Sequence, residues 1–230
     1  MLTRILHKIF KAKPNSMSSA SPIINNTRNV SPEKQDTEVY WNEDMAKILE
    51  TWGEKHVWNE IQMFLSCAQG KVLDIACGTG TTIRIVSRNK YLDVFGCDIS
   101  DLLISKAIEK GISPEKLQVC DATLMSCYSD DEFQYSYSIG SLEHFTEQGI
   151  IDFVSENHRI TKRISFHMVP VSRNGKNNGW IKTLQSYFNN NEEWWIQKFK
   201  HKYDEVIPIN SGWEDQLSIG KWFVCVRKNN

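Results

Sequence analysis

Five short apolar runs in the middle of the chain have the length and composition of buried strands. They occupy residues 72–75, 94–100, 117–122, 133–139 and 164–169. Continuous apolar runs of this length, bounded by turn residues, are typical of parallel strands that are covered on both faces. Apolar residues at helical spacing follow the first two runs, at 81–86 and 102–107. The pattern therefore predicts strands that alternate with helices.

Helical patterns precede this region. Residues 1–13 carry apolar positions on one side and basic positions on the other, and residues 40–68 predict two helices separated near Gly53. A basic amphipathic helix can lie on an anionic membrane surface, so weak membrane contact through residues 1–13 is one interpretation, and a frayed helix without a role is the other. Residues 14–36 are rich in Ser, Asn and Pro, which predicts a flexible linker.

The carboxyl-terminal part carries a different pattern. Residues 170–179 are rich in Gly, Asn and Ser and predict a loop, whereas residues 180–203 are rich in aromatic side chains and predict a helix. Two further apolar runs, at 205–209 and 222–226, predict strands.

A glycine turn follows the first predicted strand. Gly78 and Gly80 allow the backbone to turn tightly and to approach a ligand closely, and Thr81 opens the next helix. A strand, a glycine turn and a helix N-terminus together form a nucleotide-type site. The dinucleotide fingerprint G-x-G-x-x-G is incomplete, because Ile83 stands at the third glycine position.

An acidic residue stands at the end of each of the first three predicted strands. Asp74 would repel a pyrophosphate but can accept hydrogen bonds from an amino group. Asp98 lies twenty residues after Gly78, the distance at which an acid of a Rossmann fold meets ribose hydroxyls; it could instead cap a helix, although Ser100 fits that position better. Asp121 could either bind a ligand or cap a turn.

The segment Asp74-x-Ala76-x-Gly78-x-Gly80 resembles the first motif of the S-adenosylmethionine (SAM)-dependent methyltransferases. The resemblance implies an α/β fold with a Rossmann-like seven-stranded sheet, mostly parallel with a C-terminal antiparallel strand, and helices on both faces. It also implies SAM as the cofactor. Many members carry glycine where this chain has Ala76, and we expect the methyl group to be tolerated. The cofactor contacts implied are Asp74, Ala76, Gly78, Gly80, Asp98, Ile99, Asp121, Ala122 and Ser138.

The segment after the fourth predicted strand, Gly140 to Phe145, resembles that of small-molecule methyltransferases, in which Leu-Glu-His is a frequent string. It departs from the Asn-Pro-Pro-Tyr type of the nucleic-acid amino methylases. We expect His144 to lie beside the transferable methyl group as a candidate general base, with His167 as the second candidate. The alternative is that these histidines orient or pack, and that Glu143 is an acid in the first turn of a helix.

The charge distribution narrows the choice of acceptor. Residues 1–32 contain five basic residues and no acid, which leaves 22 basic and 28 acidic residues in the remainder, a net charge of −6. An acidic body is a poor match for a phosphate backbone, which disfavours a nucleic-acid acceptor. The six scattered cysteines contain no CxxC pair and predict reduced thiols rather than disulfides or a metal site. We expect a cytoplasmic protein.

These observations predict an enzyme that methylates a small-molecule or carbohydrate-like acceptor, such as a glycan precursor. The alternatives are a nicotinamide-dependent oxidoreductase on a Rossmann fold and a non-catalytic methyltransferase-fold partner subunit. We expect a flexible extension at residues 1–36 and a single domain at 37–230. Within that domain we expect a helical cap (37–70), a cofactor-binding core (71–168), an acceptor-side loop and helix (170–204) and a final antiparallel strand pair (205–228).

Overall fold

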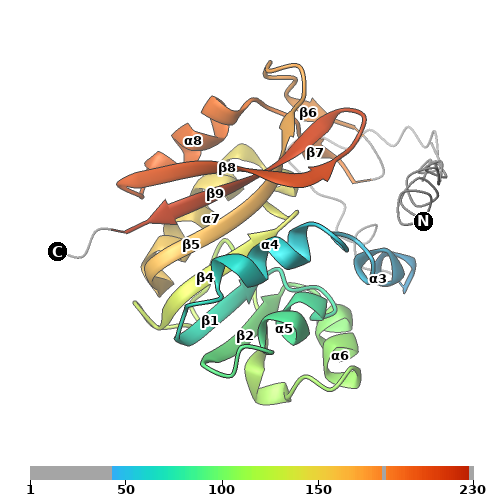
Figure 1. The fold of residues 1–230 in the computed structure, drawn as a ribbon, viewed down its shortest axis with the longest axis vertical. Helices are drawn as coiled ribbons and strands as arrows, with labels where there is room; N and C mark the ends of the chain where they lie inside the picture. Colours follow the sequence, from blue (N-terminus) through green and yellow to red (C-terminus); the bar gives the residue numbers. More distant parts are fainter. Residues whose placement is uncertain (1–42, 183–184, 228–230) are drawn as a thin grey trace, which may run out of the picture.

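The computed structural model describes residues 43–182 and 185–227 (Figure 1). The predictions for residues 1–13 and 14–36 lie outside this range. One sheet has the strand order β3-β2-β1-β4-β5-β9-β8. Its strands are β1 Gly70–Ile75, β2 Leu92–Asp98, β3 Leu117–Val119, β4 Phe133–Ile139, β5 Thr161–Ser172, β8 Glu205–Glu214 and β9 Ser218–Val226.

The strands of the predicted core, β1 to β5, are parallel to their neighbours, whereas β9 runs antiparallel to both β5 and β8. The predicted seven-stranded, mostly parallel sheet with an antiparallel strand near the carboxyl terminus is therefore confirmed. Strand β1 pairs with β2 on one side and with β4 on the other, so the order of connection reverses at β1. In open α/β sheets, ligands bind at the carboxyl ends of the strands at such a reversal.

Helices cover both faces of the sheet (Figure 1). The first apolar core joins the sheet to α4, α5 and α6, and the second joins it to α7 and α8. These helices span Val57–Phe64 (α4), Thr81–Val86 (α5), Asp101–Glu109 (α6), Glu147–Ile160 (α7) and Glu192–Lys200 (α8), and the short helix α3 spans Glu43–Leu49. In the part of the chain that the structure describes, no helix is long and apolar enough to span a membrane.

The predicted helix over residues 180–203 is wrong in its first half. Among the described residues of this range, 180–182 and 185–203, only α8 is helical, and a two-stranded antiparallel ribbon, β6 Trp180–Ile181 and β7 Tyr187–Phe188, precedes it. Trp180 and Phe188 face each other across the ribbon, with ring centroids 4.9 Å apart. Cross-strand pairing of these aromatic rings, rather than helical spacing, explains their positions.

The helix α4 is tied to the far end of the chain by one carboxylate. Glu60 accepts hydrogen bonds from the Ser211 hydroxyl (2.7 Å), the Gly212 N–H (2.6 Å) and the indole Nε1 of Trp222 (2.7 Å). The register of β8 shifts between Asn210 and Glu214, so these donors come from an irregular part of the strand. Glu60 thereby holds this irregularity against α4.

Candidate active site

The glycine turn between β1 and α5 passes through left-handed backbone conformations. Ala76, Gly78 and Gly80 have φ angles of 59°, 55° and 73°. Such angles cost glycine little but cost a residue with a β-carbon about 1–2 kcal/mol. Ala76 is therefore strained, and its methyl group is accommodated at a cost. Hydrogen bonds from the Gly80 N–H to the Cys77 carbonyl (3.0 Å) and from the Cys77 N–H to the Cys97 carbonyl (2.9 Å) close the turn.

Asp98 joins the glycine turn to the end of β2. Its carboxylate oxygens accept hydrogen bonds from the backbone N–H groups of Gly78 and Ser100, each at 2.9 Å. The N-cap of α6 is Ser100, whose hydroxyl accepts from the Leu103 N–H. Burial raises the pKa of Asp98, and the backbone hydrogen bonds partly offset this. Each oxygen of a carboxylate has two acceptor sites, so Asp98 retains capacity for further donors.

Asp74 lies at the end of β1, next to the turn, and is buried with its Oδ2 lacking a hydrogen-bond partner among the described residues. Burial raises the pKa of this carboxyl well above its usual range; the neighbouring Tyr137 hydroxyl lowers it in part, and the Asp98 charge raises it further. A buried polar atom without a partner costs about 1–3 kcal/mol. Such an atom at the reversal point of the sheet indicates a place for a hydrogen-bond donor from a ligand.

Three of the predicted cofactor contacts, Ile99, Asp121 and Ala122, follow β2 and β3, which are neighbours in the sheet. Asp121 is exposed, and its Oδ1 accepts from both the N–H and the hydroxyl of Thr123 at 2.8 Å. It therefore caps the turn after β3, while its other oxygen carries no such bond. Ala122 is buried, and Ile99 leaves 45% of its surface exposed directly after Asp98. The structure thus places an apolar side chain and a carboxylate at the same edge as the glycine turn.

The residues that follow β4 form a short 3₁₀ helix, Leu142–His144, rather than the first turn of α7. The His144 ring lies against Tyr187 of β7, with centroids 6.4 Å apart, and its Nδ1 is 3.0 Å from the Ser186 carbonyl oxygen. A carbonyl only accepts, so Nδ1 carries the proton and Nε2 is the basic nitrogen. The side chain retains 19% exposure, and burial lowers its pKa. His144 is therefore neutral at neutral pH.

The sequence pattern predicted no role for Glu143 beyond that of an acidic residue in the first turn of a helix. Its side chain is buried, and Oε2 has no hydrogen-bond partner among the described residues, while Oε1 lies 3.8 Å from Nε2 of His144. Burial raises the pKa of Glu143 to about 8. The hydroxyl of Ser141, two residues earlier, also lacks a partner. The local sequence around Glu143 does not predict its burial, because the residues that bury it are distant in the chain.

His167 lies in the interior instead. It is fully buried, its ring stacks on Phe199 of α8, and its Nδ1 and Nε2 contact the Ser138 hydroxyl (2.8 Å) and the side-chain amide nitrogen of Asn157 (2.7 Å). The amide nitrogen donates, so Nε2 accepts and Nδ1 donates to Ser138. Burial lowers the pKa of His167 to about 3. The structure therefore brings two predicted site residues, His167 and Ser138, to each other and not to the crevice.

Asn157 connects this histidine to a wider buried polar network. Its Oδ1 accepts from the hydroxyls of Ser136 (2.6 Å) and Thr161 (2.9 Å). The Ser136 hydroxyl also lies 3.0 Å from that of Ser165, which lies 2.9 Å from the Tyr203 hydroxyl. We call these residues, together with Ser138 and His167, the His167 network.

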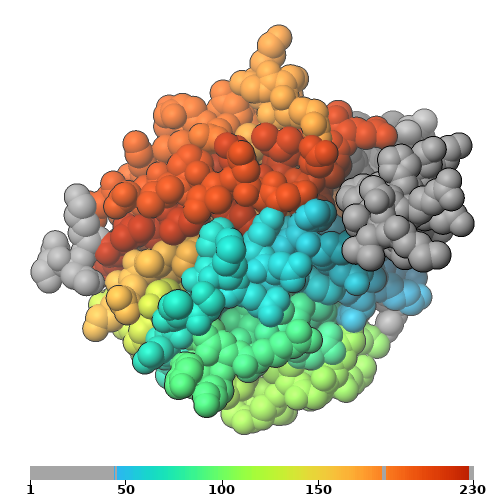
Figure 2. All heavy atoms as spheres, in the orientation of Figure 1, coloured from blue at the N-terminus to red at the C-terminus, as the bar shows by residue number. Residues whose placement is uncertain are grey.

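The segment between α3 and α4 lies directly on the glycine residues of the crevice. A β-carbon on Gly78 would lie 3.2 Å from Leu49, and one on Gly140 would lie 2.7 Å from the ring of Trp52. The Trp52 ring is in turn tilted against Trp213 of β8, with centroids 5.8 Å apart. In Figure 2 this amino-terminal segment forms a blue and cyan band between the green surface of α5 and α6 and the red surface of β8 and β9.

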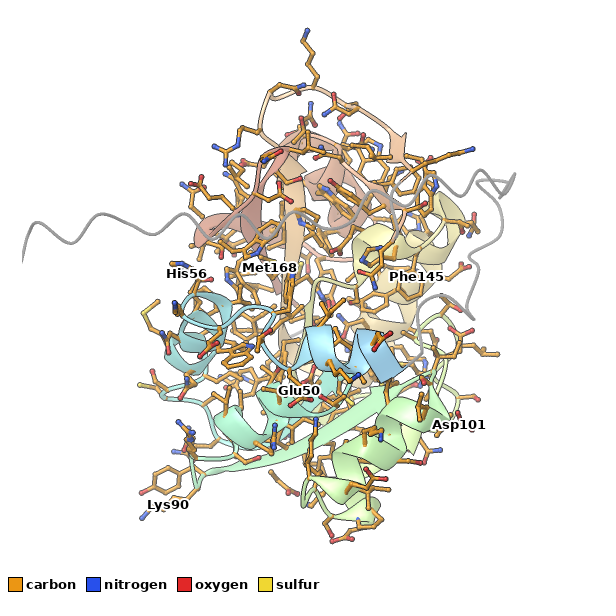
Figure 3. All side chains as sticks on the ribbon, turned by 90° about the vertical axis from the view of Figure 1, so that its right-hand side faces the viewer. Glu50, His56, Lys90, Asp101, Phe145 and Met168 are labelled. Carbon is orange, nitrogen blue, oxygen red and sulfur yellow. The ribbon has the colours of Figure 1, made fainter. Side chains whose placement is uncertain are left out.

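Glu50 fastens this segment to the glycine turn and to the end of α6. It accepts a 2.6 Å hydrogen bond from the Thr79 hydroxyl in the glycine turn and pairs with Lys110, which follows α6. Figure 3 shows Glu50 near the centre of this side of the molecule, with Lys90 and Asp101, which precede and follow β2, at opposite sides of the view. The pattern of acids along the sequence did not reveal Glu50, because it precedes the sheet and stands in no motif.

Comparisons with known proteins agree with this geometry. Residues 72–163 match the family model described as "Methyltransferase domain". No curated protein shows a significant sequence match to the chain.

Solved structures share the fold at low sequence identity. A chain from the complex between the Haloferax volcanii Trm112 methyltransferase activator and a putative methyltransferase superposes with a TM-score of 0.67 at 14% identity, covering 85% of this chain and 99% of that chain. A phosphoethanolamine N-methyltransferase 2 of Haemonchus contortus, solved with phosphomonomethylethanolamine and S-adenosylhomocysteine, gives 0.66 at 16% identity, covering 87% and 61%.

A SAM-dependent methyltransferase from Clostridium acetobutylicum gives a TM-score of 0.63 at 14% identity, covering 80% of this chain and 98% of that chain. Together, the family match over residues 72–163 and these shared folds agree with the resemblance of the glycine turn. Residues 72–163 thus resemble a methyltransferase domain, and the chain has the Rossmann-like fold that it shares with these SAM-dependent methyltransferases.

Proposed function

We propose that the protein transfers a methyl group from SAM to a small-molecule or carbohydrate-like acceptor. SAM supplies a methyl group already activated on a sulfonium, so positioning is the main task of the protein, and it can contribute about 7–11 kcal/mol to such a reaction. In this proposal the glycine turn from Ala76 to Gly80 holds the methionine and ribose parts, Asp98 accepts from the ribose hydroxyls, and Asp121 accepts from the adenine amine.

The unpaired Oδ2 of Asp74 carries the proposal. It is an acceptor buried beside the glycine turn, where a cationic amino group of a ligand would pair with it and favour its charged form, whereas a phosphate would not. Its position therefore fits the amino-acid end of SAM and disfavours a dinucleotide. The free acceptor sites on Asp98 and Asp121 fit the nucleoside end of the same ligand.

His144 is the proposed general base for an acceptor hydroxyl. With Nδ1 donating to the Ser186 carbonyl, Nε2 carries the lone pair of the ring and is the nitrogen that would take the proton as the methyl group is transferred. The lowered pKa keeps this nitrogen unprotonated at neutral pH. His167 has both nitrogens engaged in the interior, so we assign it a structural role.

A hollow near the predicted acceptor side is our candidate acceptor subsite. It has a volume of about 450 Å³ and a mainly apolar surface from Ile181 and Leu217, and the polar side chains around it are Arg173, Asn174, Asn178, Asn189 and Gln216. Amide side chains both donate and accept hydrogen bonds, as the hydroxyls of a sugar do. The hollow is therefore our candidate for the non-reacting part of the acceptor, as in a glycan precursor.

Two other functions share the fold. A nicotinamide-dependent oxidoreductase is disfavoured by the Asp74 carboxylate and by Ile83 in place of the third fingerprint glycine. A non-catalytic partner subunit is the second alternative, and the shared fold with a protein solved with the Trm112 activator keeps a partner protein in view. A fold alone does not decide between them, since the [4+2]-cyclase SpnF also superposes, with a TM-score of 0.52 at 20% identity, covering 66% of this chain and 59% of that chain.

Calorimetric titration with S-adenosylhomocysteine and with NADH tests the cofactor. We expect S-adenosylhomocysteine to bind and to raise the melting temperature, and we expect Asp98→Ala to weaken binding by about 1–3 kcal/mol. Binding of NADH without binding of S-adenosylhomocysteine would overturn the proposal. Asp101→Ala is the matched control, because it removes an exposed carboxylate at the start of α6.

Incubation with a metabolite extract and labelled SAM, followed by mass spectrometry, tests the acceptor. Once an acceptor is known, His144→Ala should lower kcat by about 10²-fold while leaving S-adenosylhomocysteine affinity unchanged. A His144→Ala variant with full kcat would remove this residue from the mechanism. Cofactor binding without any methylated product would favour the partner-subunit alternative.

The cellular setting is also proposed. The described cysteines are free thiols, which fits the cytoplasm. Residues 1–13 remain a candidate for weak membrane contact: a peptide of these residues should gain helicity on anionic vesicles and lose binding in high salt. Unchanged circular dichroism with vesicles would leave the extension without this role.

A further inference from the structure

Two cysteines on the segment that follows β3 lie in near-bonding contact. The Sγ atoms of Cys120 and Cys127 are 3.0 Å apart, closer than unbonded sulfur atoms normally approach. Cys127 is exposed and Cys120 is partly exposed, so small reagents can reach the pair. A disulfide has an S–S distance of about 2.05 Å, so bond formation requires these sulfurs to close by only about 1 Å.

Both ends of the segment are held by the framework. On one side, the Cys120 N–H donates to the Asp98 carbonyl (2.9 Å). On the other, Met125 donates from its N–H to Glu156 (2.8 Å) and accepts at its carbonyl from Arg159 (2.8 Å). These contacts with β2 and α7 keep the two sulfurs in place. The approach of Cys120 to Cys127 is therefore a property of the fold.

We propose that Cys120 and Cys127 form a reversible intrachain disulfide by exchange with a low-molecular-weight disulfide of the glutathione class. Cys127 is the attacking thiol because it is the more exposed of the two, and Cys120 is the resolving thiol. The chemistry of the pair is independent of the proposed function. Its consequence for cofactor binding rests on that function, because the segment closed by the bond carries Asp121 and Ala122.

The exchange has two steps. The Cys127 thiolate attacks one sulfur of the small disulfide, which forms a mixed disulfide and releases one thiol. Cys120 then loses its proton and attacks the Sγ of Cys127, which forms the internal bond and releases the second thiol. The two protons of the protein thiols end on the two released thiols. The protein pair is oxidised by two electrons and the small disulfide is reduced by two.

The position of the two cysteines explains why the attack of Cys120 on the mixed disulfide matters for cofactor binding. A glutathione adduct on Cys127 is bulky and charged, and it would stand at the segment that carries the proposed adenine contacts. The internal bond removes this adduct and preserves the conformation that the segment already has. Burial raises the pKa of Cys120 to about 12, so Cys120 reacts only with a partner already placed against it.

Mass spectrometry after treatment with oxidised glutathione tests the pair. The native protein should lose two hydrogens at this pair without retaining an adduct on Cys127, and the bond should map to Cys120 and Cys127; an adduct on the exposed Cys67 is counted separately. Cys120→Ser should accumulate one stable glutathione adduct on Cys127, and Cys127→Ser should form no internal bond. Cys67→Ser is the matched control, because Cys67 is also exposed; this variant should form the same internal bond between Cys120 and Cys127 and lack any adduct at position 67.

Calorimetry on the same samples tests the consequence. The internally bonded protein should bind S-adenosylhomocysteine within about threefold of the reduced protein, whereas the Cys120→Ser adduct should bind at least tenfold more weakly. A stable adduct on Cys127 of the native protein, an internal bond that uses Cys67, or no reaction would overturn the proposal. Failure of all samples to bind S-adenosylhomocysteine would count against the proposed function. The disulfide between Cys120 and Cys127 would then be tested by mass spectrometry alone.

Discussion

The buried polar groups of the His167 network and those around the glycine turn differ in one respect. In the network, His167 uses both ring nitrogens and Asn157 uses both its donor and its acceptor within the protein. Around the turn, Asp74, Ser141 and Glu143 each leave a polar atom without a partner among the described residues. Two further buried side chains leave a polar atom without a partner among the described residues. Tyr137 is opposite Asp74 in the sheet, whereas Trp195 lies on α8.

This difference distinguishes buried polar residues with a structural role from those with a ligand-binding role, which the residue type alone does not. A buried polar group that is fully paired stabilises and orders the interior, and removing one partner leaves the others unpaired. An unpaired group costs stability in the free protein and is explained if a ligand completes it. By this criterion His167 belongs to the scaffold, whereas Glu143, which stands next to His144, belongs to the site.

The largest expected effect is the loss of stability in acid caused by His167. Its pKa is about 3 in the folded protein and 6.5 when unfolded, so its contribution is complete above pH 6.5 and is lost as the pH falls towards 3. At about 1.4 kcal/mol per pH unit, the full loss is roughly 5 kcal/mol. Urea unfolding between pH 7 and 4.5 should show about 3 kcal/mol of this loss.

His167→Gln should flatten this acid limb, whereas His201→Gln, which changes an exposed histidine, should not. An unchanged pH slope in the His167 variant would show that other groups cause the acid loss. The lowered pKa values of His144 and His158 act in the same direction, while the raised pKa values of Asp74 and Asp98 oppose it.

The next effect concerns Asn157. Asn157→Ala removes the buried hydrogen bonds that Asn157 makes with His167, Ser136 and Thr161. It should therefore lower the free energy of unfolding by about 3 kcal/mol. Chemical denaturation measures this change. S-adenosylhomocysteine affinity should stay unchanged, because the network does not face the crevice.

Ser155→Ala is the control, because it removes a hydroxyl on the same helix that bonds only to the Ile151 carbonyl. A loss of cofactor affinity in Asn157→Ala without a loss of stability would erase the distinction between the two regions.

Glu143→Gln should change the stability in the opposite direction and raise the free energy of unfolding. The folded pKa of Glu143, about 8, lies above its unfolded value of 4.5, so its favourable contribution is complete below pH 4.5 and is lost as the pH rises towards 8. Glutamine does not titrate, so the variant should gain on the native protein over this range, by up to roughly 3 kcal/mol near pH 7. Methyl transfer should fall at the same time.

Thermal unfolding at pH 5 and pH 8 measures the Glu143 effect, and Glu54→Gln, at an exposed position, should show none. Equal stability of the native protein and Glu143→Gln at pH 8 would mean that the carboxylate finds a partner in solution.

The smallest effect is at Ala76. Ala76→Gly removes a β-carbon at a φ of 59° and should stabilise the protein by about 1 kcal/mol or less, since the more flexible unfolded glycine chain opposes the relief. Denaturant unfolding would detect this change, with Ala68→Gly expected to destabilise because Ala68 has no positive φ. A destabilised Ala76→Gly would show that the methyl group packs usefully.

Much of the sheet could be predicted because its signal is local. The run 133–139 matches β4, and acids end β1 and β2 as the pattern indicated. The ribbon β6–β7 could not be predicted in this way, because its aromatic residues are placed by cross-strand pairing and by the contact of Ser186 with His144. The same limit applies to the site: Asp98 stands at a characteristic distance from the glycines, whereas the burial of Glu143 depends on distant residues.

The contact between Glu60 and Trp222 also has a consequence for the order of events during synthesis. These partners are separated by 162 positions, so α4 can be fastened to β8 and β9 only after both of these strands have left the ribosome. Until then Trp213, which lies against Trp52 over Gly140, is not in place. A chain that ends before β8 therefore lacks the partners that hold this cover over Gly140, even where the residues of the glycine turn are already present.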